Sequence, residues 1–272
     1  MRIYVIFRWF FCEDFAKYAL LKYIEMKAKI TFEDKEIEID LQKGIDISLP
    51  ITTDPNAARA WYIDPPKMEP VVLGDWIGDV NQGSGVNFYN IHFNPHAHGT
   101  HTETAGHVLN KRYSINKHLQ EYFFFAELIS VRPDLVGENL EITKALLEKA
   151  KRKNLDAIII RTLPNEEAKK HKNYSNTNPP YITAEGIDWL REQGVKHLLI
   201  DLPSVDPEHD NGAVAAHHTF WHTEGEVRLD CTITELVYIP DEVKDGAYFM
   251  NLQVAAFEND AAPSRPLLFE MI

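Results

Sequence analysis

Histidine and carboxylate side chains gather in one short stretch of this chain, residues 94–107. The stretch contains four of the twelve histidines and one acidic residue, namely His96, His98, His101, His107 and Glu103. Neutral imidazole and carboxylate groups are ordinary protein ligands of divalent ions such as zinc and manganese. A metal site is therefore the first function that these residue types indicate.

The spacing within the stretch favours convergence of these side chains. In an extended segment His101 and Glu103 point to the same side, because they are two residues apart. Gly99 permits a turn that residues with a Cβ atom resist, which would let one of the two preceding histidines join them. His107 lies four residues beyond Glu103, within reach if a helical turn starts there. The simpler alternative is a polar surface loop rich in histidine, but the set as a whole favours a metal site.

The composition is that of an ordinary globular chain with a strong acidic excess. The 272 residues include 28 Lys plus Arg against 41 Asp plus Glu, a net charge of −13. That charge argues against nucleic acid or an anionic membrane as a partner. The two cysteines, Cys12 and Cys231, are far apart and suggest no disulfide framework, and no apolar run is long enough to cross a bilayer. We therefore expect a cytoplasmic protein.

The first 25 residues differ in character from the rest of the chain. Residues 3–11 are apolar and aromatic, but Arg8 interrupts them and acidic residues follow closely. A secretory signal peptide has a longer uninterrupted apolar core and a small-residue cleavage site. We interpret residues 1–25 as an extension that the fold does not need, and residues 26–272 as one domain that opens with a β-hairpin.

The second half of the chain alternates between helical and strand patterns. Residues 142–153 predict a helix before the β-branched strand 157–162, and residues 183–193 predict a helix before the strand 195–201. Helix–strand units in tandem imply parallel strands joined by right-handed crossovers. Further strands are expected at residues 44–51, 86–93, 123–131 and 232–239. The pattern predicts an α/β fold in which a mixed sheet forms the core and the helix–strand units pack on it.

Several polar residues outside the first stretch are candidates for the same site. Ligands bind off the carboxyl ends of parallel strands, and Asp201, Ser204 and Asp206 follow such an end, where they line a site or cap the next turn. Glu235 shares a strand face with apolar residues, which is costly unless the carboxylate is paired, protonated or bound to metal. His217 and His218 are adjacent and would face opposite ways in a strand, so we expect at most one of them at a site.

Two loops leave alternatives open. Trp61 and Trp76 lie in a proline-rich loop, where they wall a pocket or simply pack the loop down. Residues 165–180 form a polar, lysine-rich loop that is either a lid or a disordered segment.

Together these motifs resemble the cyclase family of metal-dependent hydrolases, which includes bacterial kynurenine formamidases and isatin hydrolases. The family signature is His-x-Gly-Thr-His-x-Asp-x-Pro-x-His, which residues 99–101 and His107 match. A preceding Asp-Leu-Ser-x-Pro-Ile strand corresponds to residues 46–51, and the family's Asp-x-Pro-Ser-x-Asp segment corresponds to residues 201–206. The later Ala-His and Glu fall on residues 216–217 and on Glu235. The resemblance covers roughly residues 44 to 270.

The chain departs from the family signature in three positions and one insertion. The first histidine of the signature falls on Ala97, so its role must pass to His96 or His98, of which we prefer His96. The family's Asp is Glu103 here, which keeps the charge and lengthens the side chain, and the family's Pro is Ala105. Residues 221–228 form an insertion between the later histidine and glutamate. Because of these departures, either the metal has one ligand fewer or a single ion replaces two.

The resemblance implies a single domain with the swivelling β/β/α-like fold of the family and a site built around zinc or manganese. The implied metal ligands are His96, His101 and Glu103, with His217 and Glu235 completing the site, and His107 is the implied proton acceptor. The implied reaction is hydrolysis of an amide bond in a small aryl amide, with N-formylkynurenine as the first substrate to test. Cyclic imides or lactams such as isatin are the alternative substrates, and a metal-binding module without activity is the other alternative. Family members are commonly homodimers or homotetramers.

Overall fold

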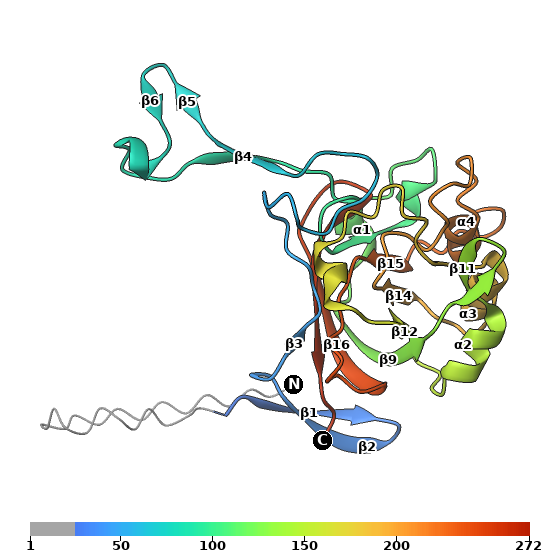
Figure 1. The fold of residues 1–272 in the computed structure, drawn as a ribbon. Coiled ribbons are helices and arrows are strands. Elements are labelled where there is room, and N and C mark those ends of the chain that lie inside the picture. The colour runs from blue at the N-terminus through green and yellow to red at the C-terminus, as the bar shows by residue number, and fades with distance from the viewer. Residues whose placement is uncertain (1–24) are drawn as a thin grey trace, which may run out of the picture.

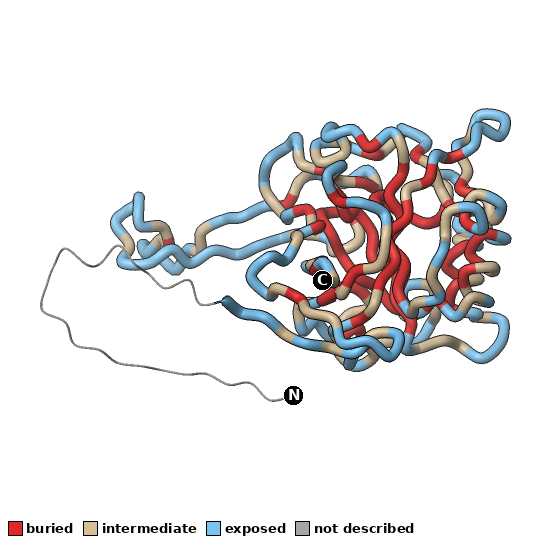
Figure 2. Tube along the Cα trace, turned by 90° about the horizontal axis from the view of Figure 1, so that it is seen from below, coloured by how far each residue is buried: buried red, intermediate tan, exposed pale blue. Residues whose placement is uncertain are grey.

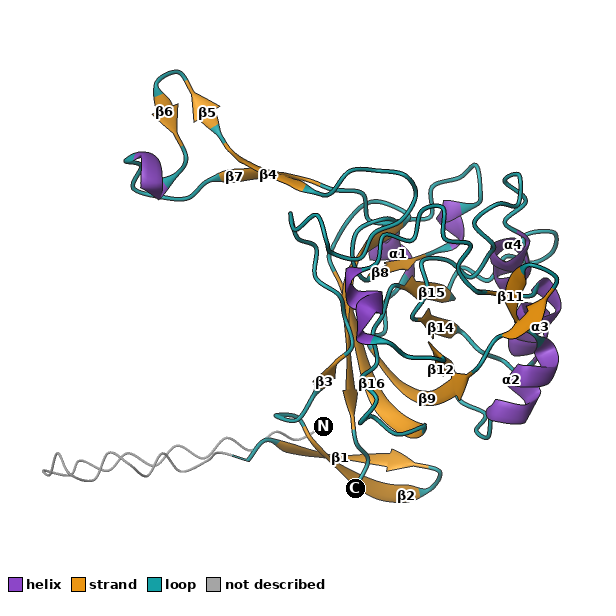
Figure 3. Ribbon diagram, viewed as in Figure 1, coloured by secondary structure: helices purple, strands orange, loops and turns teal. Residues whose placement is uncertain are grey.

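A closed barrel of seven strands forms the centre of the structure (Figures 1 and 3). The computed structural model describes residues 25–272, so residues 1–24, nearly all of the predicted extension, lie outside the described residues. The strand order is β16-β9-β12-β14-β15-β8-β17, and pairing of β17 with β16 closes the ring, while β3 is added beside β17. These strands are β3 (Ile45–Asp46), β8 (His101–Glu103), β9 (Phe123–Val131), β12 (Ala157–Thr162), β14 (His197–Ile200), β15 (Thr232–Glu235), β16 (Gly246–Val254) and β17 (Ala261–Phe269).

The barrel is mixed, as the sequence predicted, but its closure was not predicted. Strands β9, β12, β14 and β15 run parallel to their neighbours within that group. The remaining pairs, which involve β8, β16 and β17, are antiparallel. The protein is therefore a mixed α/β single domain whose core sheet is a barrel and not an open sheet.

The two predicted helix–strand units are present. Helix α2 (Lys144–Ala150) precedes β12, and helix α3 (Ala184–Glu192) precedes β14. In β12, Ile158 and Ile160 pack toward the helices, whereas Ile159 belongs to the second core cluster with residues of β9, β16 and β17. Burial on both faces explains the unbroken β-branched run in this strand.

The sequence pattern left the structure of residues 215–221 open, and the chain forms a further helix there. Helix α4 (Ala215–Trp221) contains the two adjacent histidines, which we had considered in a strand. Its neighbour β15 ends earlier than predicted, at Glu235, because Leu236 adopts a left-handed conformation with φ 54°. The predicted strand 44–51 is likewise short, consisting of β3 and an isolated bridge from Ser48 to Val237.

A two-stranded arm projects from the barrel. Figure 2 shows that the arm is largely exposed, whereas the interior of the barrel is buried. It consists of β4 (Lys67–Pro70) paired with β7 (Tyr89–His92), and of β5 (Val72–Leu73) paired with β6 (Trp76–Ile77). A 3₁₀ helix, η2 (Val80–Gln82), follows β6 near the tip. We call residues 67–92 the arm.

The remaining elements are short. They are the predicted hairpin β1 (Lys27–Phe32) and β2 (Lys35–Asp40), the 3₁₀ helices η3 (Ala105–His107) and η4 (Glu167–His171), the helix α1 (Ile115–His118), and a small sheet of β10 (Asp134–Val136), β11 (Asn139–Ile142) and β13 (Tyr181–Ile182). The loop 165–180 is thus ordered, since it contains η4 and packs through buried Tyr174. Within residues 25–272, every helix is too short or too polar to traverse a lipid bilayer.

Candidate metal centre

Strand β8 carries the two residues at the centre of the cluster. Alternation along the strand places His101 and Glu103 on the same side, and both are fully buried. Gly99 makes the approach possible, since it has φ 71° and a Cβ atom there would lie 2.8 Å from the carbonyl oxygen of Leu49. Across the antiparallel pair, Glu235 of β15 is the register partner of His101, and its Oε2 lies 3.4 Å from Nε2 of His101.

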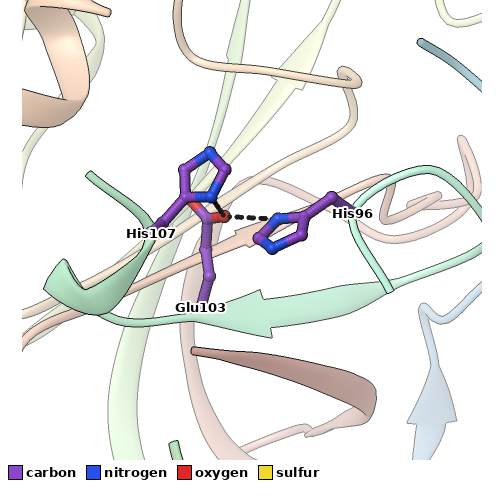
Figure 4. A group of neighbouring side chains, drawn as sticks. All are labelled: His96, Glu103 and His107. Atoms are coloured by element: carbon purple, nitrogen blue, oxygen red, sulfur yellow. Dashed lines mark ion pairs between the residues drawn. The ribbon is translucent and has the colours of Figure 1, made fainter. Parts of the chain in front are cut away.

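Short turns before and after β8 bring two more histidines to Glu103 (Figure 4). Nδ1 of His96 lies 2.9 Å from Oε2 of Glu103. After the strand, Thr104 caps η3 by accepting a hydrogen bond from the Gly106 amide, and this turn brings Nδ1 of His107 to 3.9 Å from the same oxygen. The predicted helical turn after Glu103 is therefore present as a 3₁₀ helix.

Helix α4 supplies His217 to the other oxygen of Glu103. Nε2 of His217 lies 2.9 Å from Oε1 of Glu103 and 3.6 Å from Oε1 of Glu235. Asp206 fixes this ring, because its carboxylate lies 2.5 Å from Nδ1 of His217 and also accepts the backbone N–H groups of Ala216 and His217. A carboxylate behind an imidazole is the common arrangement that orients a metal-binding histidine.

Asp260 is a member of the cluster that sequence reasoning missed. Its Oδ2 lies 2.8 Å from Nε2 of His96 and 3.5 Å from Nδ1 of His107. Burial would raise the pKa of Asp260, but the two histidines lower it below its ordinary value. The residue reaches the site because the next residue, Ala261, pairs with Glu103 in the barrel. No local pattern around Asp260 distinguishes it from an ordinary surface aspartate.

Other predicted residues lie outside the cluster. The His98 ring contacts the carbonyl oxygen of Asp64 at 2.9 Å and accepts the Asn94 N–H at 3.0 Å, so we leave His98 out of the proposed ligand set. His218 faces Thr223 instead. Asp201 is also separate, because it pairs with Lys169 at 2.8 Å.

An open cavity of about 360 Å³ leads to the cluster. Its lining includes His96, His107, His217 and Glu235, and Ser204 borders it as well. Trp61 forms part of the wall, held by a hydrogen bond from its indole N–H to the His96 carbonyl oxygen at 3.1 Å. Trp76 lies on the arm in β6 and does not line this cavity.

The charges in the cluster are strongly coupled. Burial would raise the pKa of Glu103, but the nearby imidazoles of His107 and His217 hold it well below its ordinary value. Burial would lower the pKa of His96, but its contacts with Asp260 and Glu103 raise that pKa to about 10. The pKa of His217 is raised in the same way. The buried carboxylates are therefore stable only beside positive charge, which protonated imidazoles or a divalent ion can supply.

The donor set fits a divalent metal. Two groups of side chains have ligand atoms within 4.8 Å of one another, His101–Glu103–Glu235 and His96–Glu103–His107, and both include Glu103. Nε2 of His101 and Oε2 of Glu103 are buried, and neither makes a well-aligned hydrogen bond within residues 25–272, although Glu235 and His96 lie close to them. Buried polar atoms in this state are costly unless another group, such as a cation, satisfies them. A buried set of imidazoles and carboxylates is the set that zinc or manganese binds.

Comparisons with known proteins identify the family of this chain. A curated kynurenine formamidase from Bacillus thuringiensis (strain Al Hakam) is 29% identical to this chain, and the match covers 82% of this chain and 96% of the relative. A second one, from Bordetella petrii, is 26% identical, and the match covers 78% of this chain and 99% of the relative. The isatin hydrolase A of Labrenzia aggregata has the same fold, with a TM-score of 0.60 and 16% identity over 83% of this chain and 93% of that one. Residues 45–207 match the family model described as "Putative cyclase". This chain therefore belongs to the Cyclase family.

Proposed function

We propose that this protein is a metal-dependent hydrolase that cleaves the amide bond of a small aryl amide, with N-formylkynurenine as its substrate and kynurenine and formate as products. The observation that carries the proposal is the convergence of His101, Glu103 and Glu235, the last of which lines an open cavity. The similarity to curated kynurenine formamidases over most of the chain supports this substrate class.

The proposed ligands are His96, His101 and Glu103, with His217 and Glu235 completing the site. Glu103 belongs to both candidate ligand groups, but one of these groups includes His107, so a second ion would need His107 as a ligand. These residues would hold a zinc or manganese ion, which would supply polarisation of the substrate carbonyl and a lowered pKa, toward about 7, for bound water. The protein contributes rigid placement, since three of these residues lie on paired barrel strands.

His107 is the proposed proton carrier. Its side chain is 32% exposed at the mouth of the site, whereas the side chain of Glu103 below it is fully buried. An imidazole in this position can accept a proton from the attacking water and deliver it to the departing amine. Asp260 lies 3.5 Å from Nδ1 of His107 and limits how this ring can turn.

Trp61 is proposed to contact the aryl group. It lines the cavity beside His96 and His107, and the hydrogen bond from its indole N–H fixes one edge of the ring. Both Trp61 and Tyr62 adopt left-handed backbone conformations, with φ 64° and φ 60°. Strained backbone of this kind persists where the surroundings hold it, here through Tyr62, whose hydroxyl donates to Glu208 at 2.6 Å.

We also propose that the protein is a homo-oligomer and acts in the cytoplasm. The buried free thiol of Cys231 supports a reducing compartment.

The arm supports the proposed homo-oligomer. It carries large apolar side chains that are 37–65% exposed, and a two-stranded ribbon is marginally stable without a covering surface. These side chains are Met68, Val72, Leu73, Trp76, Val80, Val86, Phe88, Tyr89 and Ile91. Light scattering should give the mass of a dimer or tetramer, and Leu73→Asp with Phe88→Asp should reduce it.

The test of the proposed function combines metal analysis with two substrates. The purified protein should contain zinc or manganese, hydrolyse N-formylkynurenine, lose this activity with a chelator and regain it when the metal is returned. Isatin is assayed in parallel, because faster opening of isatin would favour the cyclic substrates. A metal-loaded protein that hydrolyses neither compound would be a binding module, and the proposed reaction would be wrong.

A further inference from the structure

A second cavity lies at the carboxyl ends of the parallel strands, away from the candidate metal centre. Its volume is about 540 Å³, and it shares no lining residue with the cavity above the metal site. Thr162 at the end of β12 and Arg132 just after β9 lie on its wall, as does Leu202 beyond β14. Ligands of parallel sheets bind in this position, off the carboxyl ends of the strands.

The cavity is rich in positive charge, although the chain carries a net charge of −13. Three cationic side chains line it, Arg132, Lys169 and Lys172, together with His171, against the single acidic side chain of Glu166. Within residues 25–272, neither Arg132 nor Lys172 forms an ion pair with a carboxylate. Two unpaired cations on one cavity wall favour an anionic ligand.

Lys169 has a different role, because its ammonium group is already satisfied. It donates to the carbonyl oxygen of Thr162 at 2.6 Å and to its hydroxyl at 2.9 Å, and it pairs with buried Asp201 at 2.8 Å. This contact holds η4 against the end of β12 and so gives the cavity a fixed floor. The cations that remain free to meet a ligand are therefore those of Arg132 and Lys172.

Tyr174 offers an unused hydrogen-bonding group on the same wall. The residue as a whole is only 3% exposed and lines the cavity, and its hydroxyl forms no hydrogen bond within residues 25–272. Nζ of Lys172 lies 4.9 Å from the centre of its ring, so the ammonium and the phenol border the same space. The hydroxyl oxygen is not sealed inside the protein, so a ligand in the cavity can reach it and accept its hydrogen bond.

The other side of the cavity is apolar. Pro133, Leu140, Leu163, Pro164 and Leu202 contribute to its lining. We propose that this cavity is a second binding site, separate from the metal centre, for a small organic carboxylate with an apolar body. Arg132 and Lys172 bind the carboxylate, the Tyr174 hydroxyl donates to it, and the proline and leucine side chains pack on the body of the ligand.

The experiment uses benzoate as the probe, because it combines a carboxylate with a flat apolar ring. Calorimetric titration into the full-length, metal-loaded protein should give saturable binding. Lys172→Gln and Arg132→Gln should each weaken it at least tenfold, and Tyr174→Phe should weaken it by about 3- to 10-fold through the lost hydrogen bond. Lys149→Gln is the matched control, since Lys149 is exposed on α2 and lies outside the cavity.

Two further titrations separate this site from the metal centre. Cyclohexylammonium has an apolar ring of the same size but the opposite charge, and it should not bind. Glu103→Gln, which changes the metal centre, should leave benzoate binding unchanged. The proposal is overturned if benzoate does not bind, if binding survives both Lys172→Gln and Arg132→Gln, or if Glu103→Gln removes it. Melting curves of each variant verify that the fold is intact.

Discussion

His101 and Glu235 face each other as register partners on the antiparallel strands β8 and β15, with 3.4 Å between Nε2 and Oε2. The register is fixed by backbone hydrogen bonds, so the relative position of these two side chains does not depend on a flexible loop. Glu235 is held further by the N–H of Val205, which donates to its Oε1 at 3.1 Å. The barrel therefore preorganises the core of the candidate metal centre.

The first prediction concerns Glu103, which contacts three histidines from two sides. Glu103→Gln keeps the shape but removes the charge, so we expect metal affinity and hydrolysis to fall by at least about 100-fold. Glu103→Asp introduces the residue of the family signature, and this variant should retain part of the metal affinity and part of the hydrolysis rate. Metal content by mass spectrometry and hydrolysis of N-formylkynurenine measure the two effects. Full metal occupancy in Glu103→Gln would exclude this carboxylate as a ligand.

Local spacing predicted part of this site and could not predict the rest. The pair His101 and Glu103 was evident because alternation in a strand depends only on neighbouring residues. Glu235 was a candidate because of its apolar strand face, and one of the two adjacent histidines was a candidate as well, but only the family resemblance assigned His217 and Glu235 to the metal, since nothing local links them to β8. Asp260 was missed because it joins the cluster only through the pairing of β17 with β8, a contact between distant segments.

The same limit explains what was missed in the fold. The parallel strands were predicted because their apolar runs are buried on both faces. Strands β16 and β17 have interrupted patterns, with Asn251 and Gln253 in the first and Pro263 and Arg265 in the second. They close the barrel by pairing with each other and with β9 and β8, and this tertiary pairing overrides their weak local preference.

The second prediction concerns His107, the proposed proton carrier. His107→Ala should lower kcat for N-formylkynurenine by about 10²- to 10⁴-fold, the usual contribution of a general acid–base group. The metal content should remain, because His101 and Glu235 are untouched. His92→Ala, which alters an exposed histidine of the arm, is the control and should retain full activity. Unchanged kcat in His107→Ala would show that another group moves the proton.

The third prediction assigns Asp260 a positioning role. Its carboxylate lies 2.8 Å from His96 and 3.5 Å from His107, so Asp260→Asn removes a charge that orients both rings. We expect kcat to fall by about 10-fold while KM and metal content stay close to those of the parent protein. Asp260→Glu should recover part of kcat, because it restores the charge. A loss of folded protein without any selective change in kcat would instead indicate a purely structural residue.

The fourth prediction concerns the support of the Trp61 wall. Tyr62→Phe removes the hydrogen bond to Glu208, so the strained turn and the indole ring should be held less firmly. We expect KM for N-formylkynurenine to rise by about 3- to 10-fold with little change in kcat. Tyr181→Phe is the matched control, since it removes a similar hydroxyl–carboxylate contact, to Glu141 at 2.7 Å, away from the site. Equal KM values for both variants would argue against this role.

The fifth prediction concerns stability in acid and His197, which lies in the barrel wall away from the metal centre. Its ring lies 4.0 Å from that of Phe124, and its Nδ1 is 2.9 Å from the Thr232 hydroxyl. Burial lowers the pKa of His197 from 6.5 to about 4. Between these values the unfolded chain binds the proton and the folded protein does not, so acid favours unfolding.

The contribution of His197 is therefore complete above pH 6.5 and is lost as the pH falls toward 4. Over that range we expect its share of the free energy of unfolding to fall by about 3 kcal/mol, because each pKa unit corresponds to about 1.4 kcal/mol. Asparagine does not titrate between pH 7 and pH 4. The free energy of unfolding of His197→Asn should therefore fall by about 3 kcal/mol less than that of the parent protein over this range, whatever its value at pH 7. Urea unfolding at several pH values measures both slopes, and parallel slopes would mean that His197 titrates alike in the folded and unfolded states.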